Sequence, residues 1–173
     1  LHNVQSLVAH SSCLINDQRF LNADMICVTE TWIASASVSQ TALSGFRFYH
    51  QNRESSYDNS NRTFADLKIQ TRGGVGMFVK NNLQVQPVTH FCNIEHLCMF
   101  LPEQKILVAV VYRPPRHYSI VDFRGNLTRL IHHLSETFPF GIIVLGDFNE
   151  NLRTSTSIQS LMEGMGFSQH VTG

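Results

Sequence analysis

Charge is scarce and balanced in this sequence. Charged residues make up 15% of the 173 positions, below the roughly one quarter that is usual in globular proteins. Lys and Arg number 13 and Asp and Glu number 13, so the formal net charge is zero. The overall charge therefore gives no argument for binding nucleic acid, although a local basic patch stays compatible with it.

The sequence also lacks the marks of secreted, zinc-binding and membrane proteins. No two of its four cysteines form a Cys-x-x-Cys pair, so we expect reduced, buried thiols in an intracellular protein of the nucleus or cytoplasm. No stretch reaches the roughly 18 apolar residues of a membrane span, and no apolar segment after a basic one marks a signal peptide. What the sequence does have is 43% hydrophobic residues, enough for a real core.

The length fits one domain, which we expect to cover residues 1–173. Both ends look cut from something longer, because the chain begins in what resembles the end of a strand. Residues 51–72 are rich in Asn, Ser, Arg and Asp and poor in apolar residues. We therefore predict a long surface loop there.

The order of the predicted elements indicates the fold class. Apolar periodicity and end signals predict helices over residues 12–21, 119–137 and 157–163. Apolar runs and alternation predict strands over 24–31, 45–50, 73–80, 83–88, 94–101, 105–112 and 141–146. Four strands in succession without a helix argue against a strictly doubly wound sheet. We therefore predict a mixed α/β sandwich, with sheets at the centre and helices outside.

The most informative segment is Gly146-Asp147-Phe148-Asn149, which follows an apolar run that we predict to be a buried strand. Residues i and i+2 of a strand point to the same face, so Asp147 and Asn149 would lie side by side where the strand ends. A carboxylate and a carboxamide there can bind a hard cation, hold a phosphate oxygen or activate a water. The alternative is a plain turn, since Gly, Asp and Asn all favour turns.

Other polar residues also stand at predicted strand ends. Glu30 follows an apolar run, and Tyr112 and Arg113 end a strand just before two prolines. A tyrosine hydroxyl and a guanidinium at such a place can contact a phosphate, which makes Arg113 a candidate substrate-binding residue. Asn3 stands near the start and is almost uninformative alone. Each also has a plain explanation, as an exposed carboxylate, a rim tyrosine beside a solvated arginine, or a turn residue.

Taken together, the motifs resemble a known family. Asn3, Thr29-Glu30-Thr31-Trp32, Gly73-Gly74-Val75-Gly76, Tyr112-Arg113-Pro114-Pro115 and Gly146-Asp147-Phe148-Asn149 occur in an order similar to that of the endonuclease/exonuclease/phosphatase superfamily. They look most like the apurinic-type endonuclease domain of LINE-class, non-LTR retrotransposons. The resemblance implies a four-layered α/β sandwich of two packed mixed sheets flanked by helices, with the active site at one end of the sheets. It also implies a monomer that nicks DNA and has no membrane partner.

The resemblance further implies roles for the candidate site residues. Glu30 would bind a divalent metal, Mg²⁺ or Mn²⁺, with Asn3 beside it as a second metal-site residue. Tyr112 would contact the scissile phosphate. Asp147 would orient or deprotonate the attacking water, and Asn149 would help to position the phosphate and the metal.

The sequence departs from the family at its C-terminal end. Family members carry a later aspartate and a Ser-Asp-His triplet, and this chain ends at Gly173, where that region should begin. No Ser-Asp precedes His170. We therefore expect an incomplete domain in which the C-terminal strands of one sheet are missing. Two alternatives stay open, namely a catalytically inactive remnant or binding module, and a phosphatase or lipid phosphodiesterase of the same superfamily.

Overall fold

The strands of the computed structural model, which describes residues 1–33, 42–115, 118–150 and 157–170, form two four-stranded sheets. Sheet A has the order β1 (His2–Asn3), β2 (Met25–Thr29), β4 (Val75–Lys80), β3 (Phe46–Gln51). Sheet B has the order β5 (Gln86–Val88), β6 (Glu95–Leu101), β7 (Ile106–Tyr112), β8 (Gly141–Asp147). The helices are α1 (Leu7–Asn16), α2 (Gln18–Asn22), α3 (Arg53–Ser56), α4 (Arg62–Lys68), α5 (Ile120–Thr137) and α6 (Ser157–Gly164).

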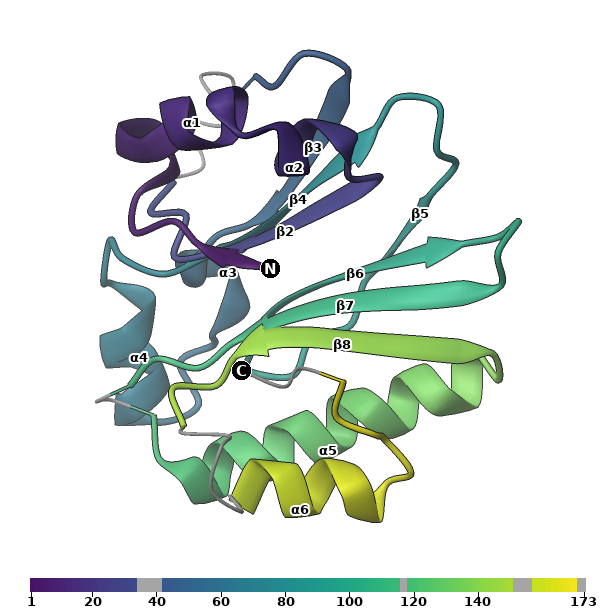
Figure 1. Cartoon of the computed structure of the whole chain (residues 1–173). Helices are drawn as coiled ribbons and strands as arrows, with labels where there is room; N and C mark the ends of the chain where they lie inside the picture. Colours follow the sequence, from purple (N-terminus) through teal and green to yellow (C-terminus); the bar gives the residue numbers. More distant parts are fainter. Residues whose placement is uncertain (34–41, 116–117, 151–156, 171–173) are drawn as a thin grey trace.

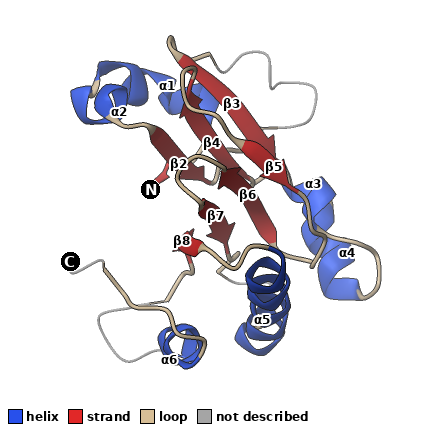
Figure 2. Cartoon of the chain, turned by 90° about the vertical axis from the view of Figure 1, so that its right-hand side faces the viewer, coloured by secondary structure: helices blue, strands red, loops and turns tan. Residues whose placement is uncertain are grey.

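The two sheets lie face to face, with α1 and α2 outside sheet A and α5 and α6 outside sheet B (Figure 1). Figure 2 shows the same arrangement turned by 90°, with α3 and α4 beside the sheets. Each sheet is mixed, because β1–β2 and β7–β8 are parallel pairs and the other pairs are antiparallel. The predicted fold class, a mixed α/β sandwich with packed sheets and outer helices, is confirmed.

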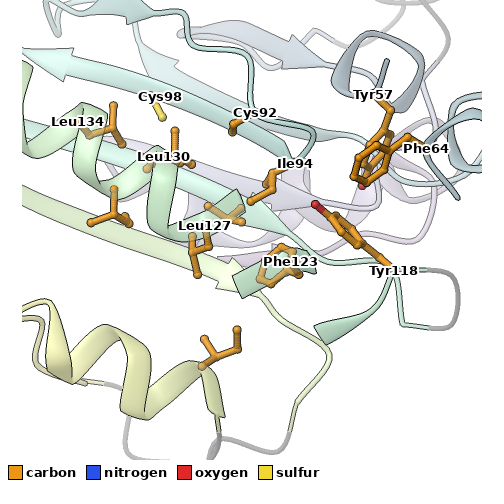
Figure 3. Close-up of a cluster of buried hydrophobic side chains, with 14 of the residues drawn as sticks. Tyr57, Phe64, Cys92, Ile94, Cys98, Tyr118, Phe123, Leu127, Leu130 and Leu134 are labelled. Carbon is orange, nitrogen blue, oxygen red and sulfur yellow. The ribbon is translucent and has the colours of Figure 1, made fainter. Parts of the chain in front are cut away.

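Alternation along the strands divides the core into layers. In β7, Val108 and Val110 pack toward sheet A, whereas Leu107 and Ala109 belong to the cluster under α5. Helix α5 lays Leu127, Leu130 and Leu134 on sheet B (Figure 3), and all three are fully buried. Burying each such side chain contributes about 1.5–3 kcal/mol. The predicted helix over residues 119–137 is confirmed, and Ser119 caps it by accepting a hydrogen bond from the Asp122 amide at 3.1 Å.

The first helix is wrong in its bounds. We expected one helix over residues 12–21, but α1 begins at Leu7 and the chain breaks at Asp17. Ser6 caps α1 by accepting from the Ala9 amide at 3.4 Å, and Asp17 caps α2 by accepting from the Arg19 amide at 2.9 Å. Two polar residues that looked interior or flanking are therefore helix caps.

The surface loop predicted over residues 51–72 is also wrong, because it contains α3 and α4. Two of its asparagines are helix caps, since Asn52 accepts from the Ser55 main-chain amide and Asn61 from the Phe64 main-chain amide, both at 2.9 Å. Tyr57 is buried and packs with Phe64 and Tyr118, at centroid distances of 5.8 and 6.0 Å (Figure 3). A few apolar residues among many polar ones anchor this segment to the end of sheet B.

Strand β8 is correctly predicted in position but not in burial. It is the edge strand of sheet B, so every one of its residues is half-buried or exposed, and Ile143 is 45% exposed. A cavity of about 630 Å³ lies between β8 and α6. None of the six candidate site residues lines it, so these residues lie outside this cavity.

The thiols match the expectation from the sequence. Cys27, Cys92 and Cys98 are buried and free, while the side chain of Cys13 is not described. Burial raises the pKa of Cys27 to about 11. Among the described helices, none is both long and apolar enough to cross a membrane.

Candidate active site

Strand register brings the predicted residues to one end of the two sheets. In sheet A, the parallel pair β1–β2 places Asn3 beside Thr29, so Glu30 follows directly. In sheet B, the parallel pair β7–β8 places Tyr112 beside Asp147. Since parallel strands end at the same edge of a sheet, the candidate residues of each sheet lie together at one edge.

Hydrogen bonds join the polar side chains at these two sheet edges into one network. The Asn3 amide nitrogen donates to Glu30 Oε1 at 3.1 Å and to Asp147 Oδ2 at 2.8 Å. The Tyr112 hydroxyl donates to the same Glu30 Oε1 at 3.0 Å. Asn3, which carried the weakest signal in the sequence, is thus the residue that links the carboxylate of one sheet to that of the other.

Residues 147–149 form a turn, and the same residues carry the polar side chains of the candidate site. The main-chain N–H of Asn149 donates to Asp147 Oδ1 at 3.1 Å, and Asn149 has a φ of 50°. Asn tolerates this left-handed conformation better than most residues. A Cβ at Gly146 would lie 2.8 Å from the Val111 carbonyl oxygen, so only glycine fits before Asp147. The two alternatives raised by the sequence, a turn and a polar site, are therefore compatible at these residues.

Arg113 supports this turn through hydrogen bonds to its main-chain carbonyls. Its guanidinium donates to the carbonyls of Phe148 at 2.7 Å, Asn149 at 3.1 Å and Tyr118 at 3.2 Å. The Asn149 side chain returns a bond to the Arg113 carbonyl at 2.7 Å. Arg113 is only 8% exposed. Its contact with a phosphate stays a prediction, and the geometry favours support of the main chain.

The backbone around Glu30 is held in an uncommon conformation. Glu30 has a φ of 56° and Trp32 a φ of 53°, values that cost a non-glycine residue free energy and persist only where neighbours enforce them. Three main-chain bonds do so. Ser6 N donates to Glu30 O at 2.9 Å, Thr31 N to Gly74 O at 3.3 Å, and Trp32 N to Gly73 O at 2.8 Å.

The electrostatics of the site keep the Tyr112 hydroxyl protonated, as a hydrogen-bond donor. Burial, and next the negative charge of Glu30, raise the pKa of Tyr112 above its ordinary value of 10.0. The phenol therefore stays protonated at neutral pH. It can donate to Glu30, as it does here, or to another anionic oxygen at the same place.

The oxygen set fits one divalent cation with retained waters. Glu30 Oε1 accepts two hydrogen bonds, whereas Oε2 accepts none from the described residues. Among those residues no group of three or more His, Cys, Asp or Glu could hold a metal ion, but Mg²⁺ needs only one or two carboxylates because it keeps several waters. The nitrogen of Asn3 faces the carboxylates and its Oδ1 accepts from Gln5 N at 3.2 Å. Asn3 as a metal ligand stays a prediction.

Two buried charged residues near the site escaped sequence reasoning. Glu95 and Arg53 form an ion pair at 2.7 Å. Glu95 and His96 open a strand that is otherwise apolar, and a charged residue at such a place is a signal that could have found Glu95. Arg53 lies in the segment that resembled a loop, and nothing in its local sequence distinguishes it from a surface arginine.

Comparison with known proteins gives both a family and structural relatives. The model of the Endonuclease/Exonuclease/phosphatase family matches residues 1–164. No curated protein matches the chain. Among solved structures, the human Nocturnin catalytic domain with bound sulfate is 16% identical, with a TM-score of 0.51 over 86% of this chain and 62% of that one. An AP endonuclease from Archaeoglobus fulgidus is 17% identical, with a TM-score of 0.54 over 84% and 55%.

A third similar structure, truncated TDP2 from Caenorhabditis elegans, is 12% identical, with a TM-score of 0.54 over 90% of this chain and 63% of that one. The chain thus spans between 55% and 63% of the length of these three structures. At such identities the likeness shows the fold alone.

Proposed function

The chain belongs to the endonuclease/exonuclease/phosphatase family, and we propose on this premise that it hydrolyses phosphodiester bonds in DNA with a divalent metal, Mg²⁺ or Mn²⁺. The observation that carries the proposal is the network in which Asn3 joins the Glu30 and Asp147 carboxylates. The similarity in fold to an AP endonuclease supports DNA as the substrate.

Each residue of the network has a task that its geometry allows. When bound, the metal would neutralise charge on the transition state and lower the pKa of a water. Glu30 would hold the metal through Oε2, because Asn3 and Tyr112 occupy Oε1. Asp147 would accept the proton of the attacking water. Asn3 fixes the orientation of both carboxylates.

Tyr112 and Asn149 would contact the phosphate. Tyr112 is protonated, so its hydroxyl can donate to a phosphate oxygen that approaches Glu30. Asn149 lies exposed at the end of the turn that Arg113 holds. Support of this turn by Arg113 would keep Asp147 and Asn149 in place while substrate binds.

Within the family, we propose a DNA-nicking endonuclease of LINE-type retrotransposon origin that acts as a monomer in the nucleus or cytoplasm. The Glu30-Thr31-Trp32, Tyr112-Arg113-Pro114-Pro115 and Gly146-Asp147-Phe148-Asn149 motifs, in that order, support this origin. A panel of supercoiled-plasmid, phosphomonoester and lipid phosphodiester substrates tests the preference for DNA. Turnover of a lipid or a phosphomonoester in preference to DNA would contradict it.

The activity is tested by the nicking of supercoiled plasmid. We expect nicking with Mg²⁺ that stops with EDTA and falls by about 100-fold or more in Asp147→Ala. The matched control is Asp66→Ala, which removes an exposed acid from α4 and should leave the rate unchanged. Undiminished nicking by Asp147→Ala would show that Asp147 has no part in the reaction.

Failure of the unaltered chain to nick with either metal, while it retards DNA in a gel, would favour the catalytically inactive binding module instead.

A further inference from the structure

We propose that the buried Arg53–Glu95 ion pair is a positioning element of the candidate site. It holds Tyr112 and the strand exit, that is, residues 30–32 directly after β2, in their working geometry. The inference rests on the proposed function. Glu95 is 0% exposed and Arg53 5% exposed. The pair lies between the sheets at the end where the site is, because Glu95 and Tyr112 are opposite each other in the β6–β7 register.

One line of contacts leads from the pair to Tyr112. The Arg53 guanidinium lies over the Tyr112 ring, 5.9 Å from its centroid. Arg53 is itself fixed, since its Nη1 donates to Gln70 Oε1 at 2.9 Å and its Nε to Glu95. The Tyr112 ring is therefore held between its own strand and a charge that cannot move freely. Its hydroxyl then reaches Glu30 at 3.0 Å.

A second line leads from the pair to the backbone of Glu30. The other oxygen of Glu95 accepts a hydrogen bond from the Gly74 amide. The carbonyls of Gly74 and Gly73 accept from the amides of Thr31 and Trp32. These bonds hold the residues that follow Glu30, where the positive φ values would otherwise relax. The Glu95 carboxylate thus fixes the turn on which the strained exit rests.

The glycines allow this close approach. A Cβ at Gly73 would lie 2.4 Å from Arg53 Nε, and one at Gly74 would lie 2.6 Å from Thr31 Oγ1. Both glycines also have positive φ, at 93° and 84°. The double glycine therefore lets the main chain press against the ion pair on one side and against the strand exit on the other.

Filling of the core does not account for the pair. The hydrophobic cluster between the sheets includes Met77, Met99 and Val110, all fully buried. A buried ion pair can often be replaced by apolar side chains of similar volume without loss of stability. Arg53 and Glu95 place two charges beside this cluster at the end where the site lies, since Glu95 is opposite Tyr112. The charge is of use there because it fixes donors and acceptors that an apolar pair would release.

The decisive variant is the double substitution Arg53→Met with Glu95→Leu. It keeps volume and removes both charges, so we expect the far-UV circular dichroism spectrum of the wild type. Positioning predicts a fall in the kcat of plasmid nicking on the order of 100-fold with little change in KM, as expected for misplaced reacting groups. It also predicts altered acrylamide quenching of Trp32, the one tryptophan of the chain, which lies at the strand exit.

An intermediate variant and a control variant accompany the double substitution. Arg53→Lys keeps the ion pair and loses the planar contact with Tyr112, so its kcat should lie between those of the wild type and the double variant. The control is Arg62→Met with Asp66→Leu, which removes an exposed pair on α4 and should change neither kcat nor quenching. If the double variant does not fold, wild-type kcat and quenching in Arg53→Lys overturn the proposal.

The remaining outcomes separate the proposal from the proposed function. A folded double variant with wild-type kcat, or with unchanged Trp32 quenching, overturns the positioning role and leaves the nuclease activity standing. If the unaltered chain does not nick DNA at all, the proposed function fails. Quenching of Trp32 then still decides whether the pair holds the strand exit.

Discussion

Acidification should destabilise the protein through His50. The His50 ring stacks on Phe48 at a centroid distance of 5.8 Å, and its Nε2 lies 2.8 Å from Thr31 Oγ1, one residue beyond Glu30. Burial lowers the pKa of His50 from its ordinary value of 6.5 to about 4. The folded protein thus holds His50 in its neutral form at a pH where the unfolded chain would protonate it.

The sign and size of the effect follow from linkage. Between pH 6.5 and about 4 the unfolded state binds more protons at this position than the folded state, so stability falls as the pH falls through this window. At 1.36 kcal/mol for each unit of pKa difference, the loss amounts to about 3 kcal/mol at most. The partial exposure of His50 reduces this value toward about 2 kcal/mol.

Urea unfolding at pH 7 and pH 4, followed by Trp32 fluorescence, measures the loss. Carboxylates also titrate in this window, so the informative quantity is the difference between the wild type and His50→Gln, which cannot titrate. We expect the free energy of unfolding of the variant to fall by about 2 kcal/mol less on acidification. His132→Gln, an exposed position on α5, is the control. An equal loss in the wild type and in His50→Gln would refute the reasoning.

Three further substitutions test the core and the site. Leu127→Ala should lower the free energy of unfolding by about 2–5 kcal/mol, because Leu127 of α5 is fully buried against sheet B; a loss below about 1 kcal/mol would mean that α5 packs loosely. Gly146→Ala should cost about 1–3 kcal/mol in urea unfolding and slow nicking, because its Cβ meets the Val111 carbonyl just before Asp147; wild-type stability would contradict this. Tyr112→Phe should slow nicking about 100-fold with an unchanged circular dichroism spectrum, and a wild-type rate would exclude the hydroxyl from the reaction.

Much of the fold could be predicted because its signals are local. The apolar stripe of α5 and the apolar runs of β6 and β7 each appear within a few residues of sequence. Helices α3 and α4 could not be predicted, since their stability depends on Tyr57 and Leu67 packing against distant strands. The half-exposure of β8 also escaped, because an apolar run does not reveal whether its strand lies at an edge.

The candidate site divides in the same way. Asp147, Asn149, Tyr112 and Glu30 follow strands, so sequence could place them at strand ends. The central place of Asn3 depends on the pairing of β1 with β2, which is a contact between distant segments. The proposed role of Glu95 depends on its bond with Gly74, which directly precedes β4 of the opposite sheet.

The bridge formed by Asn3 has a consequence for the order of folding. Its bond to Asp147 joins residues 144 positions apart, and the bond from Tyr112 to Glu30 spans 82. Contacts between such distant residues bear the largest entropy of loop closure and form late. The unit formed by β7, α5 and the parallel strand β8 is continuous in sequence and can form early. During refolding, the proposed nicking activity should therefore return after most of the helix content, and the hydrogen-bond network of the candidate site would mark the last step, at which the two sheets close on each other.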